Sequence, residues 1–159
     1  MIRKIIIIII IFLFGMASSS IYANINSERP FGINITPNIN SPADRISQDQ
    51  IKVYNDRVVI YIDNPQWASF TPTGSMEPVL NEKTNAIEIK PKSIEDIKVG
   101  DIISYKSKYV DGILIHRVIY KGNDEEGAYV IVKGDNNPVS DPGRIRFNQI
   151  ERVVVGLIY

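Results

Sequence analysis

The stretch Thr71-Pro72-Thr73-Gly74-Ser75-Met76-Glu77-Pro78-Val79-Leu80 places a serine beside a glycine in a turn bounded by prolines. Gly74 removes a side chain where another group can approach the backbone closely, and Pro72 and Pro78 fix the path of the chain on either side. A serine displayed in this way is a candidate nucleophile, although it needs a base to take its proton. On this stretch alone a plain Gly-Ser turn between two strands is the simpler interpretation.

The chain contains one histidine, His116, within residues 113–120. That run is apolar and rich in β-branched residues, which predicts a buried strand. A neutral imidazole can accept a hydroxyl proton near neutral pH, so His116 is a candidate base. The alternative is a core histidine bonded to a backbone carbonyl, which is the commoner role of a single histidine on a strand.

A third segment, residues 132–143, follows another predicted strand and is rich in turn-forming residues. It carries two carboxylates, Asp135 and Asp141. Either could bond the far nitrogen of His116 and stabilise the imidazolium, as the third member of a Ser-His-Asp triad does. The residues alone do not choose between them, because an Asx turn would also explain Asp135 and a turn-initiating aspartate before proline would explain Asp141.

Taken together, these segments resemble the ordered motifs of type I signal peptidases, the S26 family of serine peptidases. The resemblance covers residues 69–159, and its motifs follow the family's order. They are residues 74–78, 100–103, 116–118 and 133–137, with Asp141. His116 stands where the bacterial enzymes have a lysine, so the chain is similar to the archaeal and endoplasmic-reticulum branch, which uses Ser, His and Asp.

The resemblance implies a serine endopeptidase that removes N-terminal signal peptides from secretory precursors. Ser75 would be the nucleophile, His116 the general base and Asp141 the orienting carboxylate, while Asp135 would brace the loop. A tetrahedral oxyanion needs preplaced donors. The backbone N–H of Ser75 is one candidate, and the family resemblance assigns the Thr73 hydroxyl to the same role. Substrates would carry small residues before the cut, the enzyme would lie close to the translocation channel, and no cofactor is expected.

The N-terminus has two interpretations. Arg3 and Lys4 precede an unbroken apolar run over residues 5–14, and small residues follow as far as Ala23. This is the pattern of a secretory signal sequence. As a helix, however, residues 5–23 would span roughly 28 Å, close to the hydrocarbon thickness of a bilayer. With the resemblance, we expect a retained single-pass transmembrane helix over residues 1–23, with a cytoplasmic N-terminus and the catalytic domain on the outer face of the cell membrane.

The remainder divides into a linker and a domain. Residues 24–50 are rich in Asn, Ser, Ile and Pro without a helical or strand period, which predicts a linker. Residues 51–159 are expected to form a β-rich peptidase domain with a signal-peptidase-like fold of packed antiparallel sheets. Its expected elements are a hairpin over residues 51–62, strands at 86–90, 102–106, 113–120, 128–132 and 150–159, and a helical turn capped by Ser93. The aromatic residues Trp67 and Phe70 could pack in the core or touch the membrane surface, as tryptophan commonly does; we expect core packing.

Composition narrows the classes of function further. At 159 residues the chain has room for one domain and an anchor. Its formal net charge of zero gives no indication of a nucleic-acid partner. The absence of cysteine excludes disulfides and cysteine-based metal sites or nucleophiles, and the sequence contains no metal-ligand cluster.

Two rival functions stay open. A self-cleaving regulator of the LexA-like kind shares the β scaffold, but such regulators use a lysine base in the cytoplasm. A non-catalytic, membrane-anchored β module would use Ser75 and His116 only as structural residues. Replacement of Ser75 by alanine separates this module from the enzyme, because only the enzyme would lose precursor cleavage with its fold unchanged.

Overall fold

The computed structural model describes residues 39–159. The expected anchor over residues 1–23 lies outside this range, as does much of the expected linker. Among the described residues, no helix is both long enough and apolar enough to cross a bilayer. The prediction of a mostly β chain with antiparallel sheets is confirmed, because the strands form one six-stranded and one two-stranded sheet.

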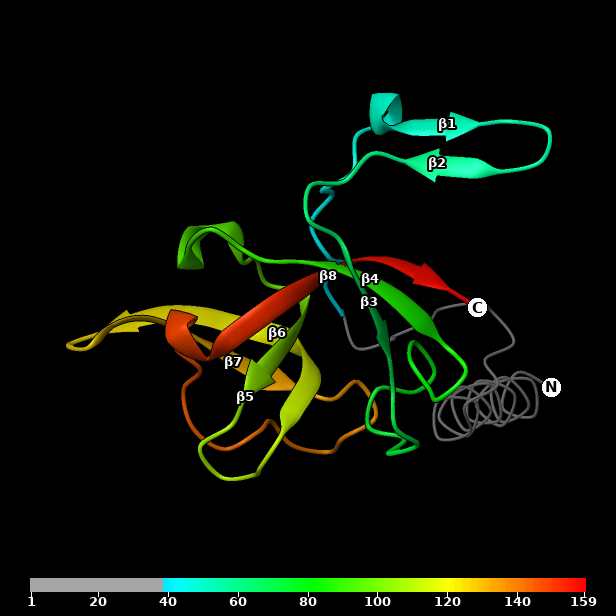
Figure 1. The fold of residues 1–159 in the computed structure, drawn as a ribbon. Coiled ribbons are helices and arrows are strands. Elements are labelled where there is room, and N and C mark those ends of the chain that lie inside the picture. The colour runs from blue at the N-terminus through cyan, green and yellow to red at the C-terminus, as the bar shows by residue number, and fades with distance from the viewer. Residues whose placement is uncertain (1–38) are drawn as a thin grey trace, which may run out of the picture. The chain divides into compact units, whose positions relative to one another are not determined.

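Figure 1 shows the arrangement of the strands. The two-stranded sheet is a hairpin of β1 (Ile51–Val53) and β2 (Val58–Ile60). The larger sheet has the strand order β3-β4-β8-β5-β6-β7. Its strands are β3 (Gln66–Ser69), β4 (Asn85–Ile89), β5 (Ile102–Lys106), β6 (Ile113–Asp124), β7 (Gly127–Lys133) and β8 (Ile150–Ile158). The short 3-10 helices are η1 (Gln48–Gln50), η2 (Ile94–Asp96) and η3 (Phe147–Gln149).

The C-terminal strand β8 joins the two halves of the larger sheet. It pairs with β4 on one side and with β5 on the other. The serine-bearing turn lies between β3 and β4 in the sequence, whereas His116 lies on β6, which pairs with β5. The insertion of β8 between β4 and β5 therefore makes one sheet of the segments that carry the serine and the histidine.

The register of β6 directs its side chains to the site. His116 lies opposite Ile103 of β5, and Arg117 lies opposite Lys133 of β7. Successive side chains of a strand point to opposite faces. His116 and Arg117 are therefore directed to different sets of partners, although they are neighbours in the sequence and both are buried.

Two residues attach the serine-bearing turn to the core. Met76 and Leu80 are each 3% exposed and belong to a hydrophobic cluster with Ala86, Ile102 and Val154. The Leu80 N–H donates to the Met76 carbonyl at 2.9 Å, so a single helical turn directs both side chains inward. Full burial of such side chains contributes about 1.5–3 kcal/mol each. This anchorage fixes the backbone next to the serine.

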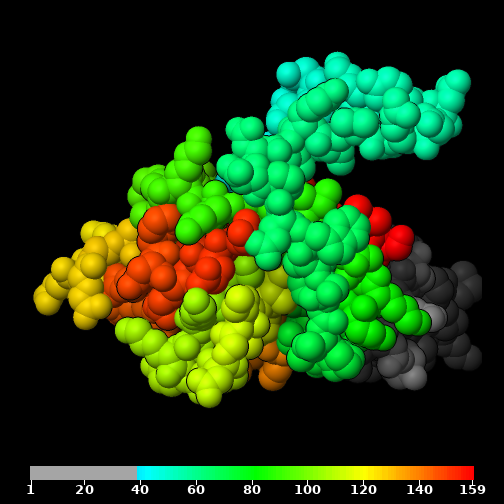
Figure 2. All heavy atoms as spheres, in the orientation of Figure 1, coloured from blue at the N-terminus to red at the C-terminus, as the bar shows by residue number. Residues whose placement is uncertain are grey.

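The predicted hairpin forms, but the sheets do not pack face to face as expected. The register Ile51↔Ile60 and Val53↔Val58 puts four aliphatic side chains on one face of the β1–β2 hairpin. They are between 38% and 76% exposed. Figure 2 shows the hairpin projecting away from the strands of the larger sheet. A two-stranded sheet is too small to cover the larger one, so the core of residues 39–159 is built around the six-stranded sheet and its loops.

The prediction for the two aromatic residues before the serine is half correct. Phe70 packs against the cluster that contains Met76. Trp67 does not enter the core, because its side chain is 58% exposed. It lies on the edge strand β3 opposite Ile87, and it lines an apolar groove with Ile158. Ala68, the next residue of β3, packs against the Met76 cluster, so Trp67 lies on the opposite face of the strand, away from that cluster.

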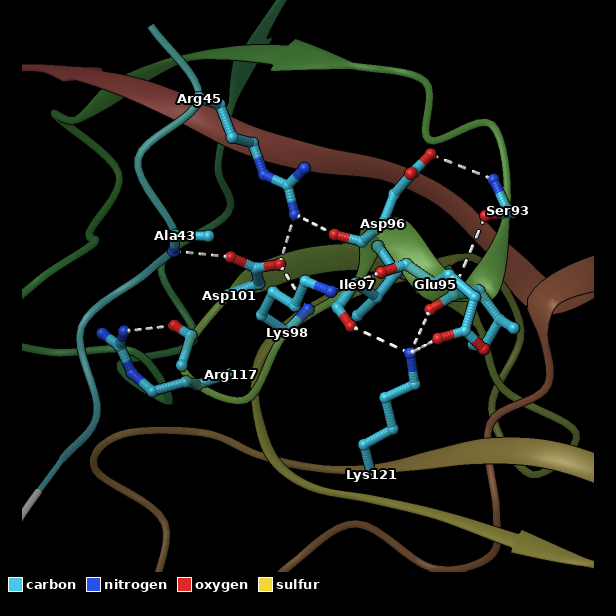
Figure 3. A network of polar contacts seen from close by, with 12 residues as sticks. Ala43, Arg45, Ser93, Glu95, Asp96, Ile97, Lys98, Asp101, Arg117 and Lys121 are labelled. Carbon is cyan, nitrogen blue, oxygen red and sulfur yellow. Dashed lines mark hydrogen bonds and ion pairs between the residues drawn. The ribbon is translucent and has the colours of Figure 1, made fainter. Parts of the chain in front are cut away.

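Part of the segment expected to be a linker is bonded to the domain (Figure 3). The fully buried carboxylate of Asp101 accepts from the N–H of Ala43 at 2.9 Å, from Arg45 at 2.5 Å and from the Lys98 N–H at 2.8 Å. A Cβ on Gly100 would meet the Ser41 carbonyl oxygen at 2.2 Å. Residues 41–45 thus lie directly on the start of β5. The nearby turn after Ser93 is confirmed, with its cap in place.

Candidate active site

The structure brings three of the sequence-predicted site residues into one hydrogen-bonded row. The Ser75 Oγ lies 3.1 Å from His116 Nε2. On the other side of the ring, His116 Nδ1 lies 2.6 Å from Asp141 Oδ2. His116 is 8% exposed, and the Asp141 side chain is 12% exposed. The imidazole therefore has the serine on one nitrogen and a shielded carboxylate on the other.

The second candidate carboxylate has a different partner. Asp135 binds Arg117 through two parallel contacts, at 2.8 Å to Nε and 2.7 Å to Nη2. Both side chains are almost fully buried, at 7% and 6% exposure. Arg117 also donates to the Gly100 carbonyl at 2.8 Å. A buried, forked pair of this kind satisfies both ions and fixes the loop that carries Asp135.

The turn that presents Ser75 depends on a left-handed residue before it. Gly74 has φ +69°, a conformation that side chains other than glycine rarely adopt. The Gly74 carbonyl accepts from the Glu77 N–H at 3.3 Å, which closes the turn. With Met76 buried behind it, the half-buried Ser75 side chain faces His116.

The loop after β7 clamps this turn. The Asn136 backbone N–H donates to the Ser75 carbonyl at 2.9 Å, and its side-chain amide donates to the Gly74 carbonyl at 3.0 Å. The Asp135 N–H also contacts the Met76 sulfur at 3.4 Å. The sequence pointed to this loop for its carboxylates, but it gave no sign that Asn136 would bond the serine turn.

The two expected oxyanion donors lie together beside the nucleophile. The Thr73 hydroxyl is 3.2 Å from Ser75 Oγ, and its oxygen accepts from the Ser75 N–H at 3.5 Å. A carbonyl presented to Ser75 Oγ would therefore have both groups within a short distance of its oxygen. Donors that are fixed before the reaction stabilise a developing oxyanion most effectively.

One polar contact of the site was not expected from the sequence. The hydroxyl of Tyr105 donates to Asp141 Oδ2, the oxygen that also faces His116 Nδ1. Tyr105 lies on β5 and is 0% exposed. Its burial, together with the bond to Asp141, raises the pKa of the Tyr105 phenol well above its ordinary value. The phenol is therefore a permanent donor.

Ser75 and His116 open into a surface cavity of about 350 Å³. One wall comes from the segment at the end of β3 and from the serine turn, and the other comes from the start of β6. The lining residues are Ser69, Phe70, Thr71, Thr73, Gly74, Ser75, Met76, Leu80, Asn81, Ile113, Leu114, Ile115 and His116. The lining is largely apolar beyond the reactive groups. An extended peptide could lie between these two walls with a carbonyl at Ser75.

The chemistry available to this arrangement is nucleophilic. His116 can take the proton of Ser75 Oγ, and the Asp141 carboxylate can stabilise the resulting imidazolium. Within residues 39–159, no group of three or more His, Cys, Asp or Glu side chains is placed to bind a metal ion.

Comparison with known proteins gives partial matches. The chain is 32% identical to the signal peptidase complex catalytic subunit sec11 of Sclerotinia sclerotiorum over 50% of this chain and 46% of that protein. It is 29% identical to the corresponding SEC11 subunit of Chaetomium globosum over 52% of this chain and 48% of that protein. An uncharacterised protein of Methanocaldococcus jannaschii is 35% identical over 48% of this chain and 44% of that protein.

The chain thus spans about half the length of the relatives that it matches. No protein-family model and no solved structure matches it. The similarity to subunits named as catalytic parts of signal peptidase complexes agrees with the S26 resemblance noted in the sequence.

Proposed function

We propose that this protein is a serine endopeptidase that removes N-terminal signal peptides from secretory precursors. The observation that carries the proposal is the continuous row of Ser75 Oγ, the His116 imidazole and the Asp141 carboxylate, with spacings of 3.1 and 2.6 Å. These groups come from separate parts of the sequence, and each has the position that its role requires. The partial similarity to signal peptidase catalytic subunits supports the choice of substrate.

The reaction follows from the positions of these groups. His116 Nε2 removes the proton of Ser75 Oγ as that oxygen attacks the carbonyl carbon of a peptide bond. The Ser75 N–H and the Thr73 hydroxyl donate hydrogen bonds to the carbonyl oxygen and stabilise its negative charge. Asp141 stabilises the imidazolium and keeps its other nitrogen protonated.

The tetrahedral intermediate then collapses. The C–N bond breaks, the proton on His116 Nε2 passes to the departing amine, and the acyl group stays on Ser75 as an ester. A water molecule attacks this ester while His116 takes one of its protons. The proton returns to Ser75 Oγ as the acid product leaves, which restores the starting state.

The cavity supports a substrate with small side chains next to the cut. Its walls carry Phe70, Ile113 and Ile115, so part of the lining near the reactive residues is apolar. Signal peptides typically end in small residues at the cleavage site. We also propose that residues 1–23 are an anchor that leaves the domain on the outer face of the membrane, near the translocation channel. The apolar run over residues 5–14 supports this part.

Cleavage of a precursor by the full chain in lipid vesicles tests the proposal. The substrate is a secretory precursor with a small residue at the cut, and the product is identified by its new N-terminus. We expect the wild-type protein and a Ser47→Ala control to cleave at the same site. Ser47 is an exposed residue at the start of η1, away from the cavity.

Ser75→Ala, His116→Ala and Asp141→Asn variants are each expected to lose cleavage by at least about a thousandfold, as removal of triad members generally does. Their thermal unfolding should match that of the wild-type protein. Cleavage at the wild-type rate by the folded Ser75→Ala variant would refute the proposal. A protein that cut its own chain and no precursor would instead favour a self-cleaving regulator.

A further inference from the structure

We propose that Tyr105 is a positioning residue that holds the Asp141 carboxylate in line with His116. This inference rests on the proposed function, because it concerns the same triad. Its basis is a single oxygen, Asp141 Oδ2, which accepts from the Tyr105 hydroxyl and also lies 2.6 Å from His116 Nδ1.

The strand register brings Tyr105 to this place. On paired strands β5 and β6, Ile103 lies opposite His116, and Tyr105 lies opposite Leu114. Residues two apart on a strand share a face. Tyr105 and His116 are therefore diagonal neighbours on one face of the sheet. Their ring centroids are 6.4 Å apart, with the planes tilted by 50°. Both rings thus extend from adjacent strands toward the same carboxylate.

The Tyr105 side chain is held more firmly than that of Asp141, its hydrogen-bond partner. It is 0% exposed and belongs to the larger hydrophobic cluster with Val118, Val130 and Val153. Its ring has only two side-chain torsions, and the surrounding core restricts both. The hydroxyl is therefore presented at a defined point, and its proton is retained because burial raises the pKa of the Tyr105 phenol.

Asp141 needs such a partner because it lies in an irregular loop. Residues 134–144 contain no strand or helix. The Asp141 backbone N–H donates to the Val132 carbonyl at 2.9 Å, which fixes the main chain but leaves the side-chain torsions free. A carboxylate bonded only to His116 could rotate toward water. The Tyr105 hydroxyl opposes this rotation from within the core.

Tyr105 does not line the cavity that opens at Ser75. It therefore has no contact with a bound substrate, and its loss should alter the chemical step and leave substrate binding unchanged. Hydrogen bonds to charged groups contribute more than those between neutral groups. We expect Tyr105→Phe to lower kcat for precursor cleavage about tenfold, with KM within about twofold of the wild-type value.

The matched control is Tyr129→Phe. Tyr129 is also buried on a strand of the same sheet, at 9% exposure, and its ring faces Arg144 and Arg146 at the end of the sheet remote from Ser75. This control removes one phenol hydroxyl and keeps the ring. We expect it to have wild-type kcat and KM. Equal kcat values for Tyr105→Phe and the wild-type protein would overturn the inference.

A second measurement needs no substrate. Because His116 is the chain's one histidine, every imidazole N–H signal of protein labelled with 15N-histidine belongs to it. The Nδ1 proton in a short bond to a carboxylate should resonate far downfield in the wild-type protein and in Tyr129→Phe. In Tyr105→Phe we expect this signal to move upfield and to exchange faster with water. An unchanged signal would contradict the inference.

Two further variants keep the test decisive. If Tyr105→Phe does not fold, the Tyr105 hydroxyl proton is observed directly in otherwise wild-type protein that carries Asp141→Asn. We expect that proton to shift upfield relative to wild type, and no shift would overturn the inference. If Tyr105→Phe does fold, its addition to Asp141→Asn should lower the residual rate no further, because Tyr105 acts through Asp141. An additional tenfold loss would indicate a separate structural effect and contradict the inference.

These readouts separate the inference from the proposed function. The wild-type protein could fail to cleave any precursor while the His116 signal changes as expected in Tyr105→Phe. That result would refute the proposed function and support the positioning of Asp141 by Tyr105. Normal cleavage that depends on Ser75 but is unaffected by Tyr105→Phe would remove the role of Tyr105 alone.

Discussion

The Ser75 carbonyl oxygen lies 2.5 Å from the position that a Cβ on Gly134 would occupy. A real Cβ cannot approach a backbone oxygen this closely. The serine turn therefore fits against the loop after β7 only because residue 134 is glycine. The Asn136 N–H donates to the same carbonyl at 2.9 Å. The loop that carries Asp141 therefore also contacts the Ser75 backbone, through Gly134 and Asn136, and holds it in place.

Gly134→Ala is expected to displace Ser75 from His116. The added methyl must push the Ser75 carbonyl away, which lengthens the 3.1 Å contact between the two side chains. A misplacement of about 1 Å can lower a rate about a hundredfold, so we expect a loss of that order in kcat for precursor cleavage. The control is Gly156→Ala, where a Cβ would meet Ile87 at an ordinary 3.7 Å. Equal rates for the two variants would contradict this account.

Asn136→Ala tests the side-chain contact between the loop after β7 and the serine turn. The substitution removes the amide that donates to the Gly74 carbonyl at 3.0 Å but keeps the backbone bond to Ser75. A hydrogen bond of this kind contributes about 1 kcal/mol, so we expect kcat to fall about fivefold. Steady-state cleavage kinetics measure the change, with the exposed η3 residue Asn148→Ala as the control. A wild-type kcat for Asn136→Ala would show that the side chain does not support the turn.

The two aspartates of the loop are expected to differ in what they affect. Asp135→Asn breaks a buried pair with Arg117, and loss of one partner of such a pair costs about 3–5 kcal/mol. The free energy of unfolding of the Asp135→Asn protein should be lower than that of the wild-type protein by roughly 3 kcal/mol, as measured by denaturant titration. Asp141→Asn should leave the free energy of unfolding nearly unchanged and lower cleavage at least about a thousandfold. The reverse pattern would exchange the roles assigned to the two carboxylates.

Glu88 gives the fold a pH dependence that is separate from the site. This residue of β4 is 4% exposed, and Oε1 has no hydrogen-bond partner among the described residues. Burial raises the pKa of the Glu88 carboxyl, while the Ser104 hydroxyl and the Arg152 charge lower it to a smaller extent. Because the pKa of Glu88 is raised in the folded state, its protonated form stabilises the fold. This contribution is fully present below the ordinary pKa of 4.5, and it is lost as the pH rises through the folded-state pKa.

Glu88→Gln should therefore increase the free energy of unfolding at pH 8, because the uncharged amide avoids the burial of a charge. The increase should shrink as the pH falls toward 4. Denaturant titration at several pH values measures the difference, with the exposed Glu82→Gln as the control. A larger gain at pH 4 than at pH 8 would show that the sign is wrong.

Local pattern predicted much of the fold. A strand was predicted over residues 102–106, after the turn at Gly100 and Asp101, and β5 has these bounds. The single histidine could be placed on a buried strand, and the turn-rich loop after β7 supplied the carboxylates. The family resemblance favoured Asp141 over Asp135, and the structure places Asp141 beside His116. Its catalytic role stays a prediction.

Long-range pairing could not be read from the sequence. The insertion of β8 between β4 and β5 joins segments about fifty to seventy residues apart, and no local signal encodes it. The contact of Tyr105 with Asp141 depends on the β5–β6 register together with the path of a loop. The exposure of Trp67 depends on which face of β3 packs against the core, and the tertiary structure shows that this is the face of Ala68.

The most direct test of the central claim is to capture the acyl group on Ser75. Wild-type protein is mixed with precursor and quenched rapidly in acid, and the peptide that contains Ser75 is analysed by mass spectrometry. We predict an added mass equal to that of the free signal peptide less one water, because its C-terminal carbonyl is joined through an ester to Ser75 Oγ, and no such adduct in Ser75→Ala. Efficient cleavage with no adduct, or with an adduct on another residue, would contradict the claim that Ser75 is the nucleophile.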